Sequence, residues 1–194
     1  VAYKIPLYHL CRPKLSENQY LCTFFRHDET HLAMIRNEYI HNGTFEFEAG
    51  GSIDGLKVVY HCSEKPYEEG QKVIWICHAL TANSDAQDWW PELVGPGKLF
   101  DTEKYFVVCA NMLGSSYGSS GPASTNPATG KPFYFEFPKV TVRDIVRAND
   151  LVRRHLGIKK IDLMVGGSIG GFQSIEWTIM EPELFDKAIF IACG

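Results

Sequence analysis

The sequence has 194 residues, of which 45% are hydrophobic, and its formal net charge is −4 at pH 7. This length and composition predict one domain with a sizeable core and exclude a disordered chain. The mild acidity and the scattered Lys and Arg argue against a surface that binds nucleic acid or an anionic membrane. No segment reaches the ~18 apolar residues of a membrane span.

The 6 cysteines form no CxxC pair and show no metal-ligand spacing, so we expect no metal site. Two of them, Cys77 and Cys109, lie inside apolar runs that are typical of buried strands. The favoured interpretation is a set of buried, reduced thiols in a cytoplasmic protein.

Residues 1–43 mix aromatic, His and charged residues without a clear period, and we interpret them as an N-terminal extension of uncertain order. The pattern becomes regular from Thr44, so residues 44–194 are predicted to form the structured domain. TFEFE at 44–48 and LKVVYHC at 56–62, with glycines between them, predict an antiparallel strand pair.

Four later runs are continuously apolar, as expected of strands buried on both faces of a parallel sheet; they cover residues 72–80, 105–112, 160–167 and 187–194. Helices are predicted between the last three of these strands. The strand and helix alternation indicates an α/β fold with a mostly parallel sheet and flanking helices. Its ligand site should lie beyond the carboxyl ends of the strands.

The first of these helices is predicted from an apolar stripe at helical spacing over residues 142–156. Thr141 and Asp144 fit a capping box at its start, and Gly157 fits the residue that ends it. The second helix is predicted over residues 169–180, before Pro182.

Residues 166–170 read GGSIG, which matches G-x-S-x-G and lies after an apolar strand and before a helix. Small residues two positions before and after the serine let the strand and the helix pack closely. The helix N-terminus favours negative charge that develops at the serine. We therefore predict that Ser168 is a catalytic nucleophile; the alternative is a structural turn with an incidental serine.

A serine nucleophile needs backbone N–H groups that stabilise the oxyanion. The amide after the nucleophile, that of Ile169, is one expected donor, and the amide of Leu80 is predicted as the second, because its loop follows the first buried strand. His78 begins the same loop. We expect it to brace the loop, and the less favoured alternative is a general base.

Several longer segments resemble the homoserine O-acetyltransferase family, and the resemblance runs from about Thr44 to the end of the chain. It is carried by CHALTANSD, by DWWPELVGPGKLFDTEKYFVVCANMLGSSYGSSGPASTNPATGKPF, by FPKVTVRDIVRANDLVRRHLGI and by VGGSIGGFQSIEWTIMEP. The resemblance implies the α/β-hydrolase fold, incomplete at the C-terminal side. Residues 44–194 would then be the N-terminal part of its catalytic domain.

The resemblance also implies a two-step acyl transfer, in which Ser168 takes an acetyl group from acetyl-CoA and passes it to the hydroxyl of L-homoserine in methionine biosynthesis. Leu80 and Ile169 match the oxyanion-hole positions of the family, and the loop over residues 111–122 should line the mouth of the active site. Trp89 and Trp90 are expected to be packing residues. Acetyl-CoA would be a co-substrate, with no bound cofactor. The resemblance also allows a homodimer of the full-length enzyme, and the oligomeric state stays open.

The acid and base of a catalytic triad are not found after Ser168. In this fold both should follow the nucleophile, yet no His does, and the remaining acids lie on the second helix or just before the last strand: Glu176, Glu181, Glu183 and Asp186. We therefore expect the N-terminal portion of a longer enzyme, with little or no transferase activity by itself.

Two alternatives stay open at this point. The same fold can act as a serine esterase or thioesterase, in which water replaces the alcohol acceptor. The chain can also be a non-catalytic fragment that serves only as a binding or assembly module. Acetyl versus succinyl donor, and homoserine versus serine acceptor, are not distinguished by the sequence.

Overall fold

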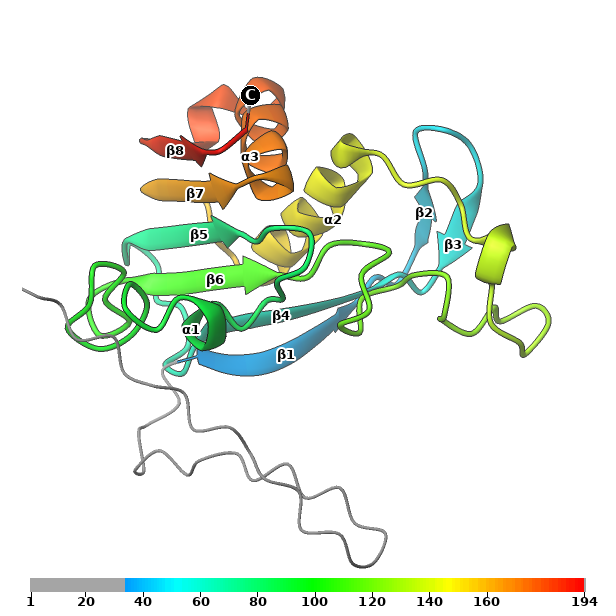
Figure 1. Ribbon diagram of the computed structural model, residues 1–194, viewed down its shortest axis with the longest axis horizontal. Helices are drawn as coiled ribbons and strands as arrows, with labels where there is room; N and C mark the ends of the chain where they lie inside the picture. Colours follow the sequence, from blue (N-terminus) through cyan, green and yellow to red (C-terminus); the bar gives the residue numbers. More distant parts are fainter. Residues whose placement is uncertain (1–33, 194) are drawn as a thin grey trace, which may run out of the picture. The chain divides into compact units, whose positions relative to one another are not determined.

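The computed structural model describes residues 34–193, so the part of the predicted extension over residues 1–33 lies outside the described residues. The main sheet has six strands in the order β1-β4-β6-β5-β7-β8 (Figure 1). Their bounds are β1 Met34–Ile40, β4 Lys57–Ser63, β5 Val73–Cys77, β6 Phe106–Ala110, β7 Leu163–Gly167 and β8 Ala188–Ile191. β6, β5, β7 and β8 run parallel, whereas β1 and β4 are antiparallel to their neighbours. The predicted mostly parallel α/β fold is confirmed.

The helical elements connect these strands. They are α1 Ala86–Trp89, the 3₁₀ turn η1 Tyr134–Glu136, α2 Val142–His155, α3 Ile169–Met180 and the 3₁₀ turn η2 Pro182–Leu184. The two long helices begin and end within one residue of their predicted bounds. None of the helices in the described range is long and apolar enough to cross a membrane.

The predicted start of the structured domain at Thr44 is wrong, because β1 precedes it. This strand pairs with β4 along its whole length, from Met34 opposite Ser63 to Ile40 opposite Lys57. It lies at an edge of the sheet, and of its side chains only that of Met34 is buried. An exposed edge strand lacks the apolar alternation that sequence analysis depends on.

The predicted pairing of residues 44–48 with 56–62 is also wrong. Instead, β2 (Thr44–Glu46) pairs with β3 (Ser52–Asp54) in a separate two-stranded sheet, with Phe45 opposite Ile53. The turn closes when the Phe47 N–H donates to the Gly51 carbonyl over 2.9 Å. The three-residue strand β3 is too short to give a periodic signal.

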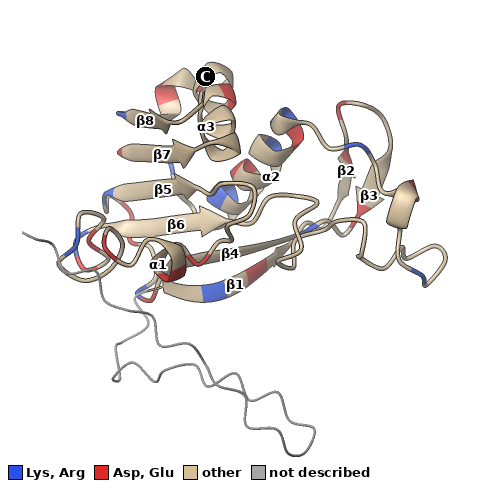
Figure 2. Ribbon diagram, viewed as in Figure 1, with Lys and Arg blue, Asp and Glu red and all other residues tan. Residues whose placement is uncertain are grey.

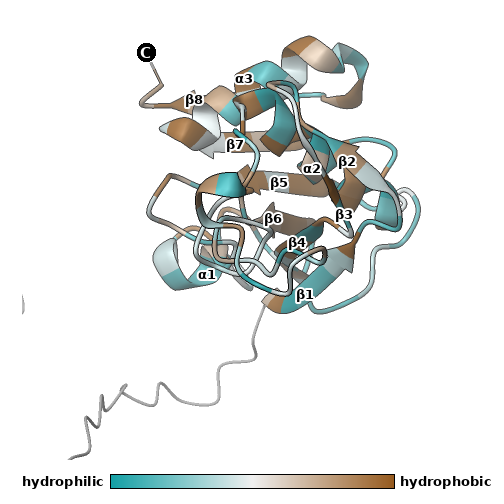
Figure 3. Cartoon of the chain, turned by 90° about the vertical axis from the view of Figure 1, so that its right-hand side faces the viewer, coloured by the Kyte–Doolittle hydropathy of each residue, from teal (hydrophilic) through white to brown (hydrophobic). Residues whose placement is uncertain are grey.

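Side chains alternate between two hydrophobic cores, one on each face of the main sheet. Trp75 and Val108 lie in the core under α2 and α3, whereas the next residues along the same strands, Ile76 and Cys109, lie in the core on the opposite face, which includes Ala86 of α1. No Lys, Arg, Asp or Glu interrupts β5, β6 or β7 (Figure 2). Their ribbons are mainly hydrophobic in Figure 3. Because both faces of these strands are buried, their sequences are continuous apolar runs, which is why they could be predicted.

Packing roles predicted for two groups, a pair of tryptophans and the cysteine thiols, are borne out for the described residues. Trp89 and Trp90 stack at a centroid distance of 4.8 Å and pack against the second core. The Cys62, Cys77 and Cys109 thiols are free and buried, and Cys193 is free and partly buried. Cys11 and Cys22 lie outside the described residues.

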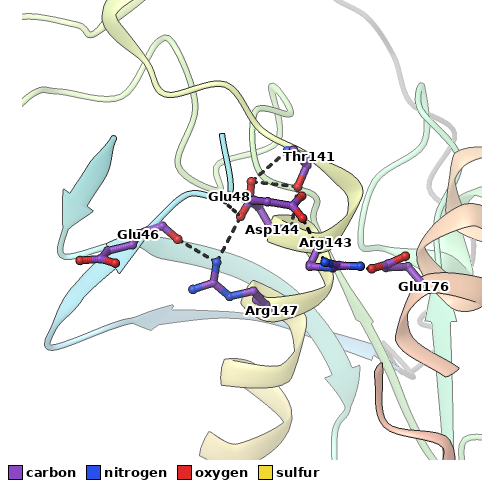
Figure 4. Close-up of polar contacts among 7 residues, drawn as sticks. All are labelled: Glu46, Glu48, Thr141, Arg143, Asp144, Arg147 and Glu176. Carbon is purple, nitrogen blue, oxygen red and sulfur yellow. Dashed lines mark hydrogen bonds and ion pairs between the residues drawn. The ribbon is translucent and has the colours of Figure 1, made fainter. Parts of the chain in front are cut away.

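The N-terminus of α2 carries the predicted capping box. The Thr141 side chain accepts a hydrogen bond from the Asp144 N–H, and the Asp144 carboxylate accepts one from the Thr141 N–H over 3.0 Å (Figure 4). Asp144 is fully buried and also accepts from the Glu48 N–H over 3.0 Å and from Arg147 over 3.3 Å. One carboxylate therefore caps the helix and holds the segment that closes the β2–β3 hairpin.

Two arginines on α2 extend this contact. Arg143 bridges Glu48 at 3.1 Å and Glu176 of α3 at 2.6 Å (Figure 4). Arg147 donates to the Glu46 carbonyl over 2.8 Å and stacks over the Phe45 ring at 4.8 Å. The hairpin, α2 and α3 are thus joined by polar contacts that the sequence did not indicate.

Candidate active site

Ser168 stands on a sharp turn between β7 and α3. Its backbone has φ 55° and ψ −123°, a conformation that is costly for a residue with a side chain. The turn is fixed because the Ser168 N–H donates to the Ile191 carbonyl over 2.9 Å, and its own carbonyl accepts from the Gly171 N–H over 2.9 Å. The residue is exposed to solvent at the start of a 12-residue helix. The serine is therefore presented at the positive end of a helix dipole.

Three of the four glycines around Ser168 are required by close packing. A Cβ at Gly166 would lie 2.2 Å from the Gly170 carbonyl oxygen, and one at Gly170 would lie 2.0 Å from that of Cys77. A Cβ at Gly171 would lie 2.5 Å from the Cys193 sulfur. Gly167 has nothing within 4 Å of such an atom, so its place in the motif has no steric reason.

The contact of Gly170 also brings together the two segments that carry the predicted oxyanion donors. A Cβ there would meet the carbonyl oxygens of both Cys77 and His78, so the first turn of α3 lies directly against the end of β5. Ile169 and Leu80 consequently line one cavity of about 470 Å³. The structure shows no hydrogen bond from either amide to another described residue, so both N–H groups are available to a ligand.

The cavity has an uncharged lining. The predicted loop over residues 111–122 contributes Met112, Leu113, Gly114, Ser115 and Pro122. Sequence analysis missed the opposite wall, which consists of Tyr134, Phe135, Phe137, Pro138, Val140 and Ile145. Phe135 and Tyr134 are largely exposed, which is unusual for aromatic side chains outside a ligand site or an interface. The run of aromatic residues after the loop was the only signal in the sequence.

His78 is fully buried and makes two hydrogen bonds. Its Nε2 accepts from the Met112 N–H over 3.2 Å, so its Nδ1 carries the proton and donates to the Ala79 carbonyl over 2.8 Å. Burial lowers the pKa of His78, which keeps the ring neutral. Both ring nitrogens are therefore engaged, which supports the bracing role and argues against the general base.

No described side chain forms a hydrogen bond with the Ser168 hydroxyl. Among the described histidines, His61 contacts Ser84 at 2.7 Å, and His41 and His155 pack against Tyr39. Three acids that follow Ser168 are engaged in ion pairs: Glu176 with Arg143, Glu181 with Arg153, and Asp186 with Lys160. Within residues 34–193 the structure therefore brings together the predicted nucleophile and two amides, without an acid or base partner.

Comparisons with known proteins identify the fold family and the relatives of this chain. A model of the alpha/beta hydrolase fold family matches residues 72–193. The homoserine O-acetyltransferase of Trichormus variabilis is 43% identical over 158 residues, which cover 81% of this chain and 44% of that protein. This chain spans less than half of the length of the curated relatives that it matches.

Solved structures include both transferases and hydrolases. The homoserine O-acetyltransferase of Bacillus anthracis has a TM-score of 0.73 and 29% identity, over 80% of this chain and 45% of that one. An acetylester hydrolase of Corynebacterium glutamicum has a TM-score of 0.71 and 28% identity, over 82% and 44%. The sequence match and the shared fold show that the chain belongs to the α/β-hydrolase fold family, with homoserine O-acetyltransferases among its relatives.

Proposed function

We propose that Ser168, Leu80 and Ile169 belong to the active site of an acyltransferase that moves an acetyl group to the hydroxyl of L-homoserine. The observation that carries the proposal is the placement of Ser168 on a positive-φ turn, next in the chain to Ile169, which lines an uncharged cavity together with Leu80. The 43% identity to a homoserine O-acetyltransferase supports the substrate. Acetyl-CoA as the donor, a role in methionine biosynthesis and a cytoplasmic location are parts of the same proposal.

In the first step the Ser168 hydroxyl oxygen attacks the thioester carbonyl of acetyl-CoA. The carbonyl oxygen becomes an oxyanion that accepts hydrogen bonds from the Leu80 and Ile169 N–H groups, and the CoA thiolate then leaves. In the second step the homoserine hydroxyl attacks the acetyl-serine ester, and Ser168 regains its proton. Each step needs a general base, which the proposal requires from outside the described residues.

The test is to incubate the protein with acetyl-CoA and with imidazole as an external general base, because no described residue supplies one, and to measure its intact mass. An acetyl adduct on Ser168 that disappears when L-homoserine is added, with release of O-acetylhomoserine, is the expected result. Ser168→Ala should form no adduct. Absence of the adduct in the parent protein with acetyl-CoA alone, together with absence of O-acetylhomoserine when both substrates are present, would contradict the proposal and leave only a binding or assembly role.

A serine esterase is the second candidate, because an acetylester hydrolase has a fold similarity close to that of a transferase. Hydrolysis and transfer share the acyl-serine intermediate and differ in the group that attacks it. Free CoA should therefore be measured with and without homoserine. A release rate that does not respond to homoserine would favour the esterase.

A further inference from the structure

Two loops that carry the candidate site are joined by one buried side chain. Asn111, which is 2% exposed, follows β6. Its Oδ1 accepts a hydrogen bond from the Ser84 N–H over 2.7 Å, and its Nδ2 donates to the Tyr117 carbonyl over 3.1 Å. Ser84 lies in the loop of Leu80, whereas Tyr117 lies in the loop over residues 111–122. The carboxamide therefore spans both loops.

A second bond closes the connection at its outer end. The Tyr117 hydroxyl donates to the Thr81 carbonyl over 3.2 Å, and Thr81 is the residue after Leu80. The bonds from Asn111 to Ser84 and to Tyr117, together with that from Tyr117 to Thr81, form a ring that ties the loops together at two points.

The Leu80 peptide is held from its other side as well. The Ala79 carbonyl accepts from His78 Nδ1 over 2.8 Å and from the Ala82 N–H over 3.0 Å. In a planar trans peptide the N–H points opposite to the carbonyl, so these bonds direct the Leu80 N–H away from His78. The Leu80 amide thus lies between two fixed carbonyls, those of Ala79 and Thr81.

The ring is also tied to the sheet. The Asn111 N–H donates to the Val59 carbonyl over 2.8 Å, and the Asn111 carbonyl accepts from the Ser119 hydroxyl over 2.8 Å. Ser119 in turn accepts from the Val59 N–H over 3.0 Å. The backbone of Asn111 is therefore fixed against β4, and its side chain transmits that position to both loops.

We infer that Asn111 and Tyr117 are positioning residues, which hold the Leu80 N–H in the direction needed to stabilise the oxyanion. The inference rests on the proposed function of Leu80. Asn is required at position 111 because the site needs one acceptor and one donor on a short side chain; Asp offers only acceptors, and Leu offers neither. Neither residue touches the reacting atoms in this scheme.

The first experiment uses Tyr117→Phe, because this residue is 42% exposed and the change removes only the hydroxyl. Acetylation of Ser168 by 4-nitrophenyl acetate is followed by mass, at increasing reagent concentration. We expect a severalfold lower maximal rate with an unchanged half-saturating concentration and melting temperature. Tyr67→Phe is the matched control, since the structure shows no hydrogen bond from that hydroxyl within residues 34–193. A maximal rate equal to that of the control would overturn the inference.

The second experiment compares Asn111→Asp with Asn111→Leu. Asn111→Asp keeps the bond from Ser84 and loses the donation to Tyr117, so its maximal rate should fall by about tenfold, less than the hundredfold or more expected when an oxyanion donor is removed. Asn111→Leu should be slower still. A purely structural role predicts lower melting temperatures with unchanged rates for the folded protein, and that result would contradict the inference.

Amide hydrogen exchange separates this inference from the proposed function. If Ser168 of the parent is never acetylated, the proposed function fails. The ring itself is then judged by the exchange of the Ala82 N–H, which should be several times faster in Tyr117→Phe than in Tyr67→Phe. Equal exchange in these two variants would show that the ring does not hold the Leu80 loop.

Discussion

The two walls of the cavity are held in different ways. The turn at Ser168 between β7 and α3, called the elbow below, is fixed by contacts between backbone atoms. Gly170 lies against the Cys77 carbonyl, and Gly166 lies against the Gly170 carbonyl. The opposite wall is fixed by side chains: the Phe137 ring packs against Phe47 at 5.9 Å and against Phe133 at 5.6 Å. Backbone contact restricts the sequence to glycine at set positions, whereas aromatic packing allows many solutions.

This difference explains what the sequence predicted well. The elbow is a local structure, and its steric rule appears directly as G-x-S-x-G between an apolar run and a helical period. The capping box of α2 is local for the same reason, since Thr141 and Asp144 are three residues apart. The central strands were found because both of their faces are buried.

The opposite wall could not be predicted, because its parts are distant in the chain. Phe47 lies 90 residues before Phe137, and Glu48 lies 96 residues before its partner Asp144. No pattern in the sequence indicates such pairs. Strand β1 was missed for a second reason, since its mainly exposed side chains leave no apolar alternation.

The largest loss in the free energy of unfolding is expected when a methyl group is added at the closest backbone contact of the elbow. Gly170→Ala places a methyl group 2.0 Å from the Cys77 carbonyl oxygen, and no rotamer change can move backbone atoms apart. We expect the free energy of unfolding to fall by about 3 kcal/mol, measured by urea denaturation. Gly167→Ala is the matched control and should change it by less than about 0.5 kcal/mol. Equal losses in both variants would mean that close packing does not define the elbow.

A somewhat smaller loss is expected when the support of the opposite wall is removed. Asp144→Ala removes the carboxylate half of the capping box and leaves the Glu48 N–H and Arg147 without their buried acceptor. We expect a loss of about 2 kcal/mol in the free energy of unfolding. Asp88→Ala, at an exposed position of α1, should be close to neutral. If Asp144→Ala were equally neutral, the hairpin would be held by the aromatic packing and by the contacts of Arg143 and Arg147.

Acid should lower the stability of the protein through two histidines, one on β4 and one directly after β5. Burial lowers the pKa of both His78 and His61 in the folded protein. The unfolded chain therefore binds more protons as the pH falls through about 6.5, and the free energy of unfolding decreases from there downward. Above that pH this stability is fully present. Urea denaturation between about pH 7.5 and pH 5.5 should show the decrease, with a smaller slope in His61→Gln. A flat profile in the parent would contradict the burial of these rings.

The smallest expected effect is slow labelling of the Cys77 thiol, which measures how often the elbow opens. Burial raises the pKa of the Cys77 thiol to about 12, so almost no thiolate exists at pH 8 and a disulfide reagent should not react with it in the parent protein. The carbonyl of the same residue lies against Gly170. Gly170→Ala should therefore expose the thiol part of the time, and peptide mapping should find a small labelled fraction at Cys77. Gly167→Ala should show none, because an added methyl group there leaves the contact between β5 and α3 intact. Labelling of Cys77 at one rate in all three proteins would mean that the thiol is reached by a route that does not involve the elbow.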